Sequence, residues 1–321
     1  MELKKYKLGV GPMSREIIDV INCYDKDLMV VTSRNQIDHD SGYVCQVKDL
    51  KLSKDKIFCR DHCGPYFSDL DTELSLDESI LKCKKTITTD IEHGVEIIHI
   101  DVSRIPAHLQ EKYAIELIEF TINLKPSIII EFGSEENTGT EISGSLSRIY
   151  RQLELIKPYI KNVRFFVTQT GSLVKHDQVG IFDIHRNKEI IDLVHAQGFL
   201  FKEHNADYLS AQDLQLRKDL GVDALNIAPQ LGVVQTRILL EQSGPSPFLT
   251  KFKQRVISGN KFSKWLPEGF YNEDSAFEVS AHYFFNTLEY RDLLNTIDTE
   301  LYKNRIATEI TKIFDFYLGA L

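Results

Sequence analysis

The sequence predicts an α/β protein whose eight strands close into a (β/α)8 barrel, the TIM-barrel fold, followed by a C-terminal helical extension. Eight short apolar segments lie between Lys7 and Ile227, and nearly all of them precede a pattern typical of an amphipathic helix. These segments and their helices fill about 240 residues, close to the roughly 250 of a typical barrel. Polar side chains follow most of the segments, as they do where the parallel strands of an active barrel end.

Five of the predicted strands lie in the first half of the chain. Ser14 can cap a helix over Arg15–Tyr24, because a serine hydroxyl accepts a hydrogen bond from a free amide of the first helical turn. A second helix covers about Asp77–Glu92, and Pro106 opens a third. The run Ile37–Leu52 is too mixed to assign. The five strands are Lys7–Val10, Leu28–Thr32, Ile57–Arg60, Val95–Ile100 and Ile128–Ile130.

In the second half, the stretch Gly198–Tyr208 shows the same plan most clearly. It begins as an apolar, aromatic run that suits a buried strand and ends in a polar tip that contains Glu203 and His204. Ser210 can cap the helix that follows, and Gly221 can end it. The other expected strands are Val163–Val167 and Ala224–Ile227, and further helices are expected over Leu146–Ile156, Lys188–Ala196 and Val233–Gln242.

We expect residues 1–243 to form the barrel with the active site, and residues 244–321 to form the helical extension. Pro245 and Pro247 interrupt the repeating pattern, and the segment after them is aromatic and helical. Because exposed aromatic surface is costly, the extension either packs on the barrel or forms a subunit interface. An open, doubly wound sheet is the alternative fold, but its glycine-rich phosphate motif is missing, since Gly9 and Gly11 stand alone.

The composition argues against nucleic acids and membranes as partners. The 321 residues are 42% hydrophobic and 26% charged, which fits an ordinary globular protein. The formal net charge is -9, so a nucleic-acid backbone or an anionic membrane would be repelled on average. No apolar run is long enough for a membrane span, and no signal-peptide pattern opens the sequence. The five cysteines contain no Cys-x-x-Cys pair, so we expect a cytoplasmic protein with reduced thiols.

Titratable and amide side chains stand at the ends of five successive predicted strands. In a closed barrel these ends meet at one mouth. Two histidines, a carboxylate and an amide from different strands suit a divalent metal, for which imidazole and carboxylate favour zinc, while cobalt or manganese would also fit. The residues are Asp61, His62, Asp101, Glu131, Glu135, Gln169 and His204.

Each of these residues also has a plainer interpretation. A single histidine at a barrel rim is more often hydrogen-bonded than a metal ligand, and only the pair His62 and His204 argues for a site. Glu131 could be the last strand residue, paired with a lysine, and Asp101 could cap the next helix. Glu136 could be solvated. The remaining histidines, His99 among them, have no such position and are taken as surface or packing residues, and the turn 226–230 is either plain or a phosphate cradle at a helix start.

Several stretches resemble the tagatose-1,6-bisphosphate aldolase Z subunit family, which is similar in turn to class II, metal-dependent ketose-bisphosphate aldolases. Residues 203–208 (EHNADY) and 224–231 (ALNIAPQL) resemble the family's HSTDY and LKVGPAL stretches, in the same order and spacing. Residues 61–65 (DHCGP), 99–103 (HIDVS), 133–135 (GSE) and 167–171 (VTQTG) resemble its DHLGP, HLDAS, GTE and VVQPG. The match runs through the whole predicted barrel.

The resemblance implies a role for each matched residue. The metal ligands would be His62, Glu135, Gln169 and His204. The catalytic carboxylates would be Asp61 as the acid and base, with Asp101, Glu136 and Asp207 assisting. Substrate would be bound by Asn35, Gln36, Ser103, Asn205, Asn226 and Gln230. For the glutamate ligand, the resemblance favours Glu135, whereas position at the strand end favours Glu131.

Two classes of function follow from the resemblance. The first is an enzyme that acts on a ketose or ketose phosphate by reversible retro-aldol chemistry through a metal-stabilised enediolate, either as an aldolase or as a 4-epimerase. The second is a non-catalytic companion that stabilises a separate class II aldolase chain. The retained histidines and carboxylates favour the enzyme. We also expect a homo-oligomer, while the sugar and its phosphorylation state stay open.

Overall fold

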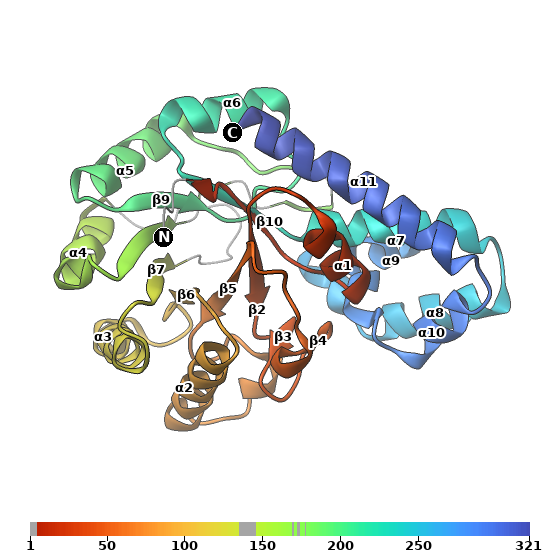
Figure 1. Cartoon of the computed structure of the whole chain (residues 1–321), viewed down its shortest axis with the longest axis horizontal. Helices are drawn as coiled ribbons and strands as arrows, with labels where there is room; N and C mark the ends of the chain where they lie inside the picture. The colour runs from red at the N-terminus through yellow and green to blue at the C-terminus, as the bar shows by residue number, and fades with distance from the viewer. Residues whose placement is uncertain (1–4, 135–145, 169, 172–173, 177) are drawn as a thin grey trace.

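A computed structural model describes residues 5–134, 146–168, 170–171, 174–176 and 178–321. Within these residues eight parallel strands close into a barrel in the order β1-β10-β9-β8-β7-β6-β5-β2, which confirms the expected TIM-barrel fold (Figure 1). The barrel strands are β1 (Leu8–Val10), β2 (Leu28–Ser33), β5 (Lys56–Cys63), β6 (Ile97–Ile100), β7 (Ile129–Ser134), β8 (Val163–Thr168), β9 (Leu200–Glu203) and β10 (Ala224–Ile227).

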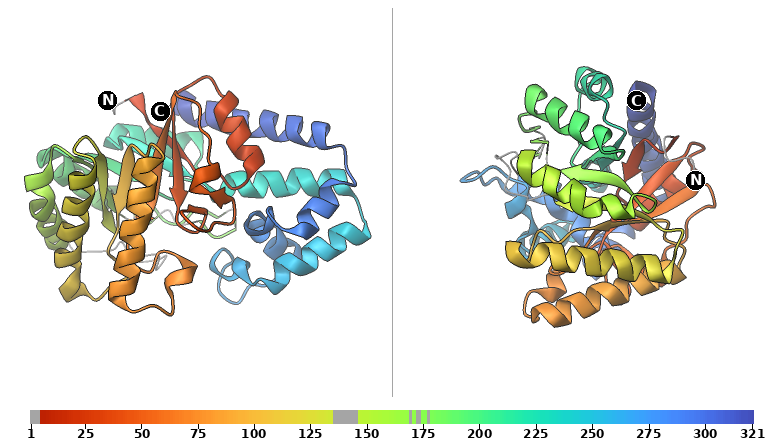
Figure 2. Two further views of the ribbon diagram at one scale, coloured as in Figure 1. Left: turned by 60° about the horizontal axis from the view of Figure 1, so that its bottom comes forward. Right: turned by 90° about the vertical axis from the view of Figure 1, so that its left-hand side faces the viewer.

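Helices surround the barrel on its outside, and a further group of helices lies to one side of it (Figures 1 and 2). Those that follow barrel strands are α1 (Arg15–Cys23), α2 (Leu76–Glu92), α3 (Ala107–Leu124), α4 (Leu146–Ile156), α5 (Ile184–Ala196), α6 (Ala211–Leu220) and α7 (Pro229–Ser243). The C-terminal group is α8 (Pro247–Ser258), α9 (Glu273–Ser280), α10 (Leu288–Leu294) and α11 (Thr299–Ala320).

Apart from the buried polar side chains Glu131 and Lys202, the barrel is largely apolar on both of its faces. Successive strand residues point to opposite faces, so one set fills the interior while the alternate set packs against the helices. The interior cluster is formed by Tyr6, Met29, Val31, Ile57, Cys59, Ile97, Phe165 and Ala224. Their strand neighbours Val30, Phe58, Ile98 and Phe166 belong to the larger core between barrel and helices. This two-sided burial explains the nearly continuous apolar runs in the sequence.

The expected caps are present where the sequence places them. The Ser14 hydroxyl accepts a hydrogen bond from the amide of Ile17 at the start of α1. Ser210 and Asp213 form a reciprocal capping box at α6, and Gly221 ends that helix in the left-handed conformation. The unassigned run after β2 contains β3 (Ile37–Asp38) and β4 (Cys45–Gln46), which pair with each other outside the barrel.

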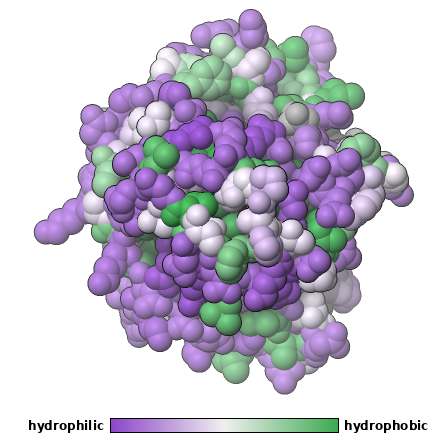
Figure 3. Space-filling view, turned by 90° about the vertical axis from the view of Figure 1, so that its right-hand side faces the viewer, coloured by the Kyte–Doolittle hydropathy of each residue, from purple (hydrophilic) through white to green (hydrophobic). Residues whose placement is uncertain are grey.

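The C-terminal helices use most of their aromatic side chains for packing. The longest, α11, runs along α7 and also contacts α1 and α6 (Figure 1). Phe277, Tyr290, Phe314 and Tyr317 are buried, whereas Phe316 is exposed. On the face that these helices present, hydrophobic side chains are scattered among hydrophilic ones (Figure 3). Packing on the barrel therefore accounts for most of the aromatic pattern. In the described part of the chain, no helix is long and apolar enough to cross a membrane.

Candidate metal centre at the barrel mouth

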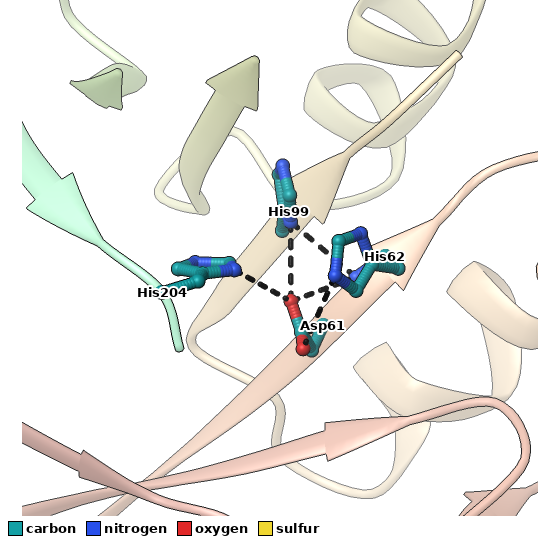
Figure 4. Close-up of side chains that lie close together, drawn as sticks. All are labelled: Asp61, His62, His99 and His204. Atoms are coloured by element: carbon teal, nitrogen blue, oxygen red, sulfur yellow. Dashed lines mark hydrogen bonds and ion pairs between the residues drawn. The ribbon is translucent and has the colours of Figure 1, made fainter. Parts of the chain in front are cut away.

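Three histidines and one aspartate meet at the carboxyl end of the barrel. Asp61 and His62 come from β5, His99 from β6, and His204 directly follows β9 (Figure 4). One potential ligand atom from each of the four lies within 4.8 Å of the others. The ring of His62 is 5.0 Å from that of His99 and 5.6 Å from that of His204, measured between centroids. Residues separated by more than 100 positions in the sequence therefore form one compact group.

An irregularity in β5 brings both Asp61 and His62 to the mouth. Arg60 pairs with Ile98 and Cys63 with Ile100, so Asp61 and His62 together face the single residue between those partners. In a regular strand the two side chains would point to opposite faces, but an extra residue changes the direction of one of them. His62 adopts a left-handed backbone with φ of 42°, which is uncommon for histidine. Strain of this kind is typical of functional sites.

Each histidine is held from behind by a hydrogen-bond acceptor or a carboxylate. His62 places Nδ1 2.8 Å from Oδ2 of Asp101. His99 places Nε2 3.3 Å from the carbonyl oxygen of Gly133. His204 places Nε2 3.7 Å from Oε2 of Glu131. A carbonyl or carboxylate only accepts, so the first two contacts place an N–H on Nδ1 of His62 and on Nε2 of His99, whereas the His204 contact is longer than a hydrogen bond.

The inner nitrogens of all three rings face the carboxylate of Asp61. The His99 Nδ1 lies 3.1 Å and the His204 Nδ1 3.6 Å from Oδ1 of Asp61, and the His62 Nε2 lies 3.7 Å from its Oδ2. Lone pairs and a carboxylate at these distances repel one another unless a proton or a cation lies between them. Metal-binding histidines commonly show this arrangement, with the outer nitrogen donating and the inner one binding the ion. The residues therefore fit a divalent metal, and nitrogen-rich ligands favour zinc.

The histidines also control the ionisation of the neighbouring carboxylates. Burial would raise the pKa of Asp61, but the surrounding imidazoles outweigh it and hold this pKa well below the ordinary value. Asp101 is fully buried, and although burial opposes its ionisation, the contact with His62 lowers its pKa below the ordinary value. Its other oxygen accepts a hydrogen bond from the amide of Ser103. Both aspartates are therefore ionised at neutral pH.

Beneath the histidines lies a buried ion pair inside the barrel. Lys202 donates to Oε1 of Glu131, and neither side chain is more than 2% exposed. Burial opposes the charge of Glu131, but Lys202 and His204 outweigh it and hold the pKa of Glu131 at about 2. Glu131 thus has the lysine partner of its plain interpretation, and its second oxygen supports His204 from behind. Lys202, in turn, is kept protonated by Glu131.

A small cavity of about 70 Å³ opens beside the metal cluster. Seven of the residues that line it are polar: Gln36, Asp61, His62, His204, Asn205, Asp207 and Asn226. Asn226 is 7% exposed, and neither atom of its carboxamide has a hydrogen-bond partner among the described residues. A β-carbon on residue 9 would lie only 2.0 Å from Oδ1 of Asn226, so only glycine at that position leaves room for this amide. A buried amide without a protein partner suits a ligand that both donates and accepts.

The other predicted substrate residues occupy different positions. Gln36 lines the cavity, but its amide already donates to the carbonyl of Pro12. Asn35 exchanges hydrogen bonds with Asp69 outside the cavity. Gln230 accepts through Oε1 from the Tyr208 amide. Ser103 does not line this cavity, and its amide donates to Asp101. Three predicted site residues, Glu135, Glu136 and Gln169, lie outside the described residues.

Two residues of this region, His99 and Lys202, are not among the site residues expected from the sequence. His99 lies within a strand and not in the loop that follows, which favours a packing role. A signal was nevertheless present, since His99 alternates with the inward-facing Ile97 and therefore points into the barrel. Lys202 stands two residues before His204, so in an extended strand both side chains point to the same face. Both could be found by following the inward face of each strand upward to the mouth.

No protein-family model and no curated protein matches the sequence significantly. Solved structures do match. A probable tagatose 6 phosphate kinase from Sinorhizobium meliloti 1021 aligns with a TM-score of 0.77 and 14% identity over 98% of this chain and 100% of that one. The fructuronate-tagaturonate epimerase of Cohnella laeviribosi aligns with a TM-score of 0.59 and 9% identity over 98% and 81% of the two chains. The fructose-bisphosphate aldolase of Campylobacter jejuni aligns with a TM-score of 0.57 and 11% identity over 98% of this chain and 90% of that one. At these identities the similarity establishes a shared barrel fold, in agreement with the resemblance seen in the sequence.

Proposed function

We propose that the protein is a metal-dependent enzyme that acts on a ketose near its carbonyl group. It would either break and re-form a carbon–carbon bond, as an aldolase, or invert the configuration of a carbon centre, as a 4-epimerase. The observation that carries the proposal is the convergence of three imidazole nitrogens on Asp61, each ring fixed by an acceptor behind it. Two structural neighbours are named as an aldolase and an epimerase of ketose substrates, which supports the same class of chemistry.

His62, His99 and His204 would hold the ion. The ligand set implied by the resemblance does not contain His99. A divalent metal at this position supplies a Lewis acid that polarises the carbonyl of the substrate. Three histidine ligands would leave a position for that carbonyl oxygen, as catalytic zinc sites do.

Asp61 is the candidate for proton transfer. Its carboxylate lines the cavity beside the three histidines, so it can accept the proton of a substrate hydroxyl group on the carbon whose carbon–carbon bond breaks. The electrons of that bond move toward the carbonyl, and a new carbonyl forms where the hydroxyl was. Return of the proton from Asp61 accompanies the reverse reaction. Epimerisation requires the same steps, with the released fragment turned before the bond re-forms.

The residues around the cavity would orient the sugar. Asn226 can accept from one hydroxyl and donate to another through its carboxamide. No lysine or arginine lines this cavity among the described residues, which does not suit the transfer of a phosphoryl group. The cavity is better matched to hydroxyl-rich carbon chemistry.

Metal content and product analysis test the proposal. We expect stoichiometric zinc or another divalent ion in the purified protein, and loss of at least about 100-fold in metal affinity on His99→Ala. His108→Ala is the matched control, because His108 is exposed and is not part of the cluster. Free triose or triose phosphate would identify an aldolase, and a C4-inverted ketose without it an epimerase. A protein that binds no metal and copurifies with a separate aldolase chain would instead be a companion subunit.

A further inference from the structure

The start of helix α7 is already occupied by a carboxylate of the protein. Oδ1 of Asp207 accepts hydrogen bonds from the amides of Ala228, at 3.1 Å, and Gln230, at 2.8 Å. Amides at this point of a barrel, after the last strand and at a helix start, commonly bind the phosphate group of a ligand. Here the same donors are used by Asp207, so the expected phosphate cradle is filled from within.

Asp207 is held in this position by the surrounding structure. The Gln230 side chain accepts from the Tyr208 amide at 2.9 Å. The Tyr317 hydroxyl of α11 donates to the carbonyl of Ala206 at 2.6 Å and accepts from the Leu209 amide at 3.2 Å. The loop is thus tied on both sides of Asp207 to helices α7 and α11. Displacing its carboxylate to admit a phosphate would break its two hydrogen bonds with the amides of Ala228 and Gln230.

The charge around the cavity also opposes a phosphate. Asp61 and Asp207 both line the cavity, while no lysine or arginine does so among the described residues. The buried cations Lys202 and Arg217 are already paired, with Glu131 and Glu203 respectively. A dianionic group beside Asp207 would therefore meet a negative charge without a positive counterpart.

We propose that the end of the substrate that meets α7 carries a hydroxyl group, which donates to Asp207, and not a phosphate. The inference rests on the proposed function, and it narrows the substrate class to ketoses with at least one unphosphorylated end. A carboxylate that lines the cavity is a strong acceptor for a sugar hydroxyl. The same group discriminates against phosphate by charge repulsion.

A ketose bisphosphate is the sharpest probe, because it brings a phosphate to α7 in either orientation. With the metal-loaded enzyme at pH 8, above the pKa of about 6 to which burial raises Asp207, we expect kcat/KM for tagatose or fructose bisphosphate to be at least about tenfold below that of the best unphosphorylated or monophosphorylated ketose. Asp207→Asn keeps the oxygen that accepts the two amides and removes the charge, so it should reduce this preference at least about tenfold. Asp219→Asn, which changes an exposed aspartate of α6, should leave it unchanged.

A bisphosphate preference in the native enzyme, or an unchanged preference in Asp207→Asn, would overturn the inference. Failure of every ketose to react would count against the proposed function instead. In that case binding of inorganic phosphate to the zinc-loaded protein still decides the inference. The native protein should bind phosphate at least about tenfold more weakly than Asp207→Asn, and equal affinities would contradict the role given to Asp207.

Discussion

Replacing Lys202 with methionine tests the buried ion pair that supports the metal centre. Methionine has a similar length but no charge, so Glu131 would remain in the barrel interior without its cation. In the native protein the pKa of Glu131 is lowered from 4.5 to about 2, which corresponds to about 3 kcal/mol in favour of its ionised form. Breaking one side of a buried pair typically costs about 3–5 kcal/mol. We therefore expect Lys202→Met to lower the free energy of unfolding by about 3 kcal/mol at pH 7.

The loss of unfolding free energy in Lys202→Met should depend on pH. A carboxylate with a lowered pKa contributes its full stabilisation above the unfolded pKa of about 4.5 and loses it as the pH falls toward 2. Without Lys202, burial raises the pKa of Glu131, and protonation of Glu131 then relieves the cost of its charge. The difference in stability between Lys202→Met and the native protein should therefore shrink as the pH is lowered from 7 to 5.

Urea denaturation of the metal-free proteins, followed by circular dichroism, measures these differences. Adding Glu131→Gln to Lys202→Met should restore most of the loss, because no buried charge then remains. The control is Lys26→Met, since Lys26 and Asp315 are both about half exposed and solvent screens the attraction between them. If Lys202→Met costs no more than Lys26→Met, or if its cost is independent of pH, then Lys202 does not stabilise the charge of Glu131.

Two further changes test how the site is held. Asp101→Asn removes the charged acceptor behind His62, so zinc affinity should fall by about 10–100-fold while the unfolding transition of the metal-free protein moves little; an affinity equal to that of the native protein in competition with a chelator would contradict this role. Tyr317→Phe removes the hydroxyl that links α11 to the loop of Asp207, which should cost about 1–3 kcal/mol of unfolding free energy, and a change below about 0.5 kcal/mol would show that the link contributes little.

The barrel itself could be predicted from the sequence because its signals are local. The apolar runs are nearly continuous because each strand is buried on both faces, against the barrel interior and against the helices. Residues such as Ser210 and Gly221 mark helix ends through contacts with their own neighbours. The position of His62 and His204 at the mouth also follows from counting strands, since parallel strands in a closed barrel all end on the same side.

The contacts of the site depend on register and packing, which no local pattern records. The irregularity in β5 brings His62 beside Asp61, and its effect appears only when β5 is paired with β6. His99 becomes a candidate ligand because the closed barrel places it beside His204, more than 100 residues away in the sequence. The sequence allows the amides at the start of α7 to bind a phosphate. The fold shows that Asp207 accepts their hydrogen bonds instead. The sequence determined which residues reach the barrel mouth, and the tertiary structure decided which of them face one another, because side-chain direction follows strand register and loop path.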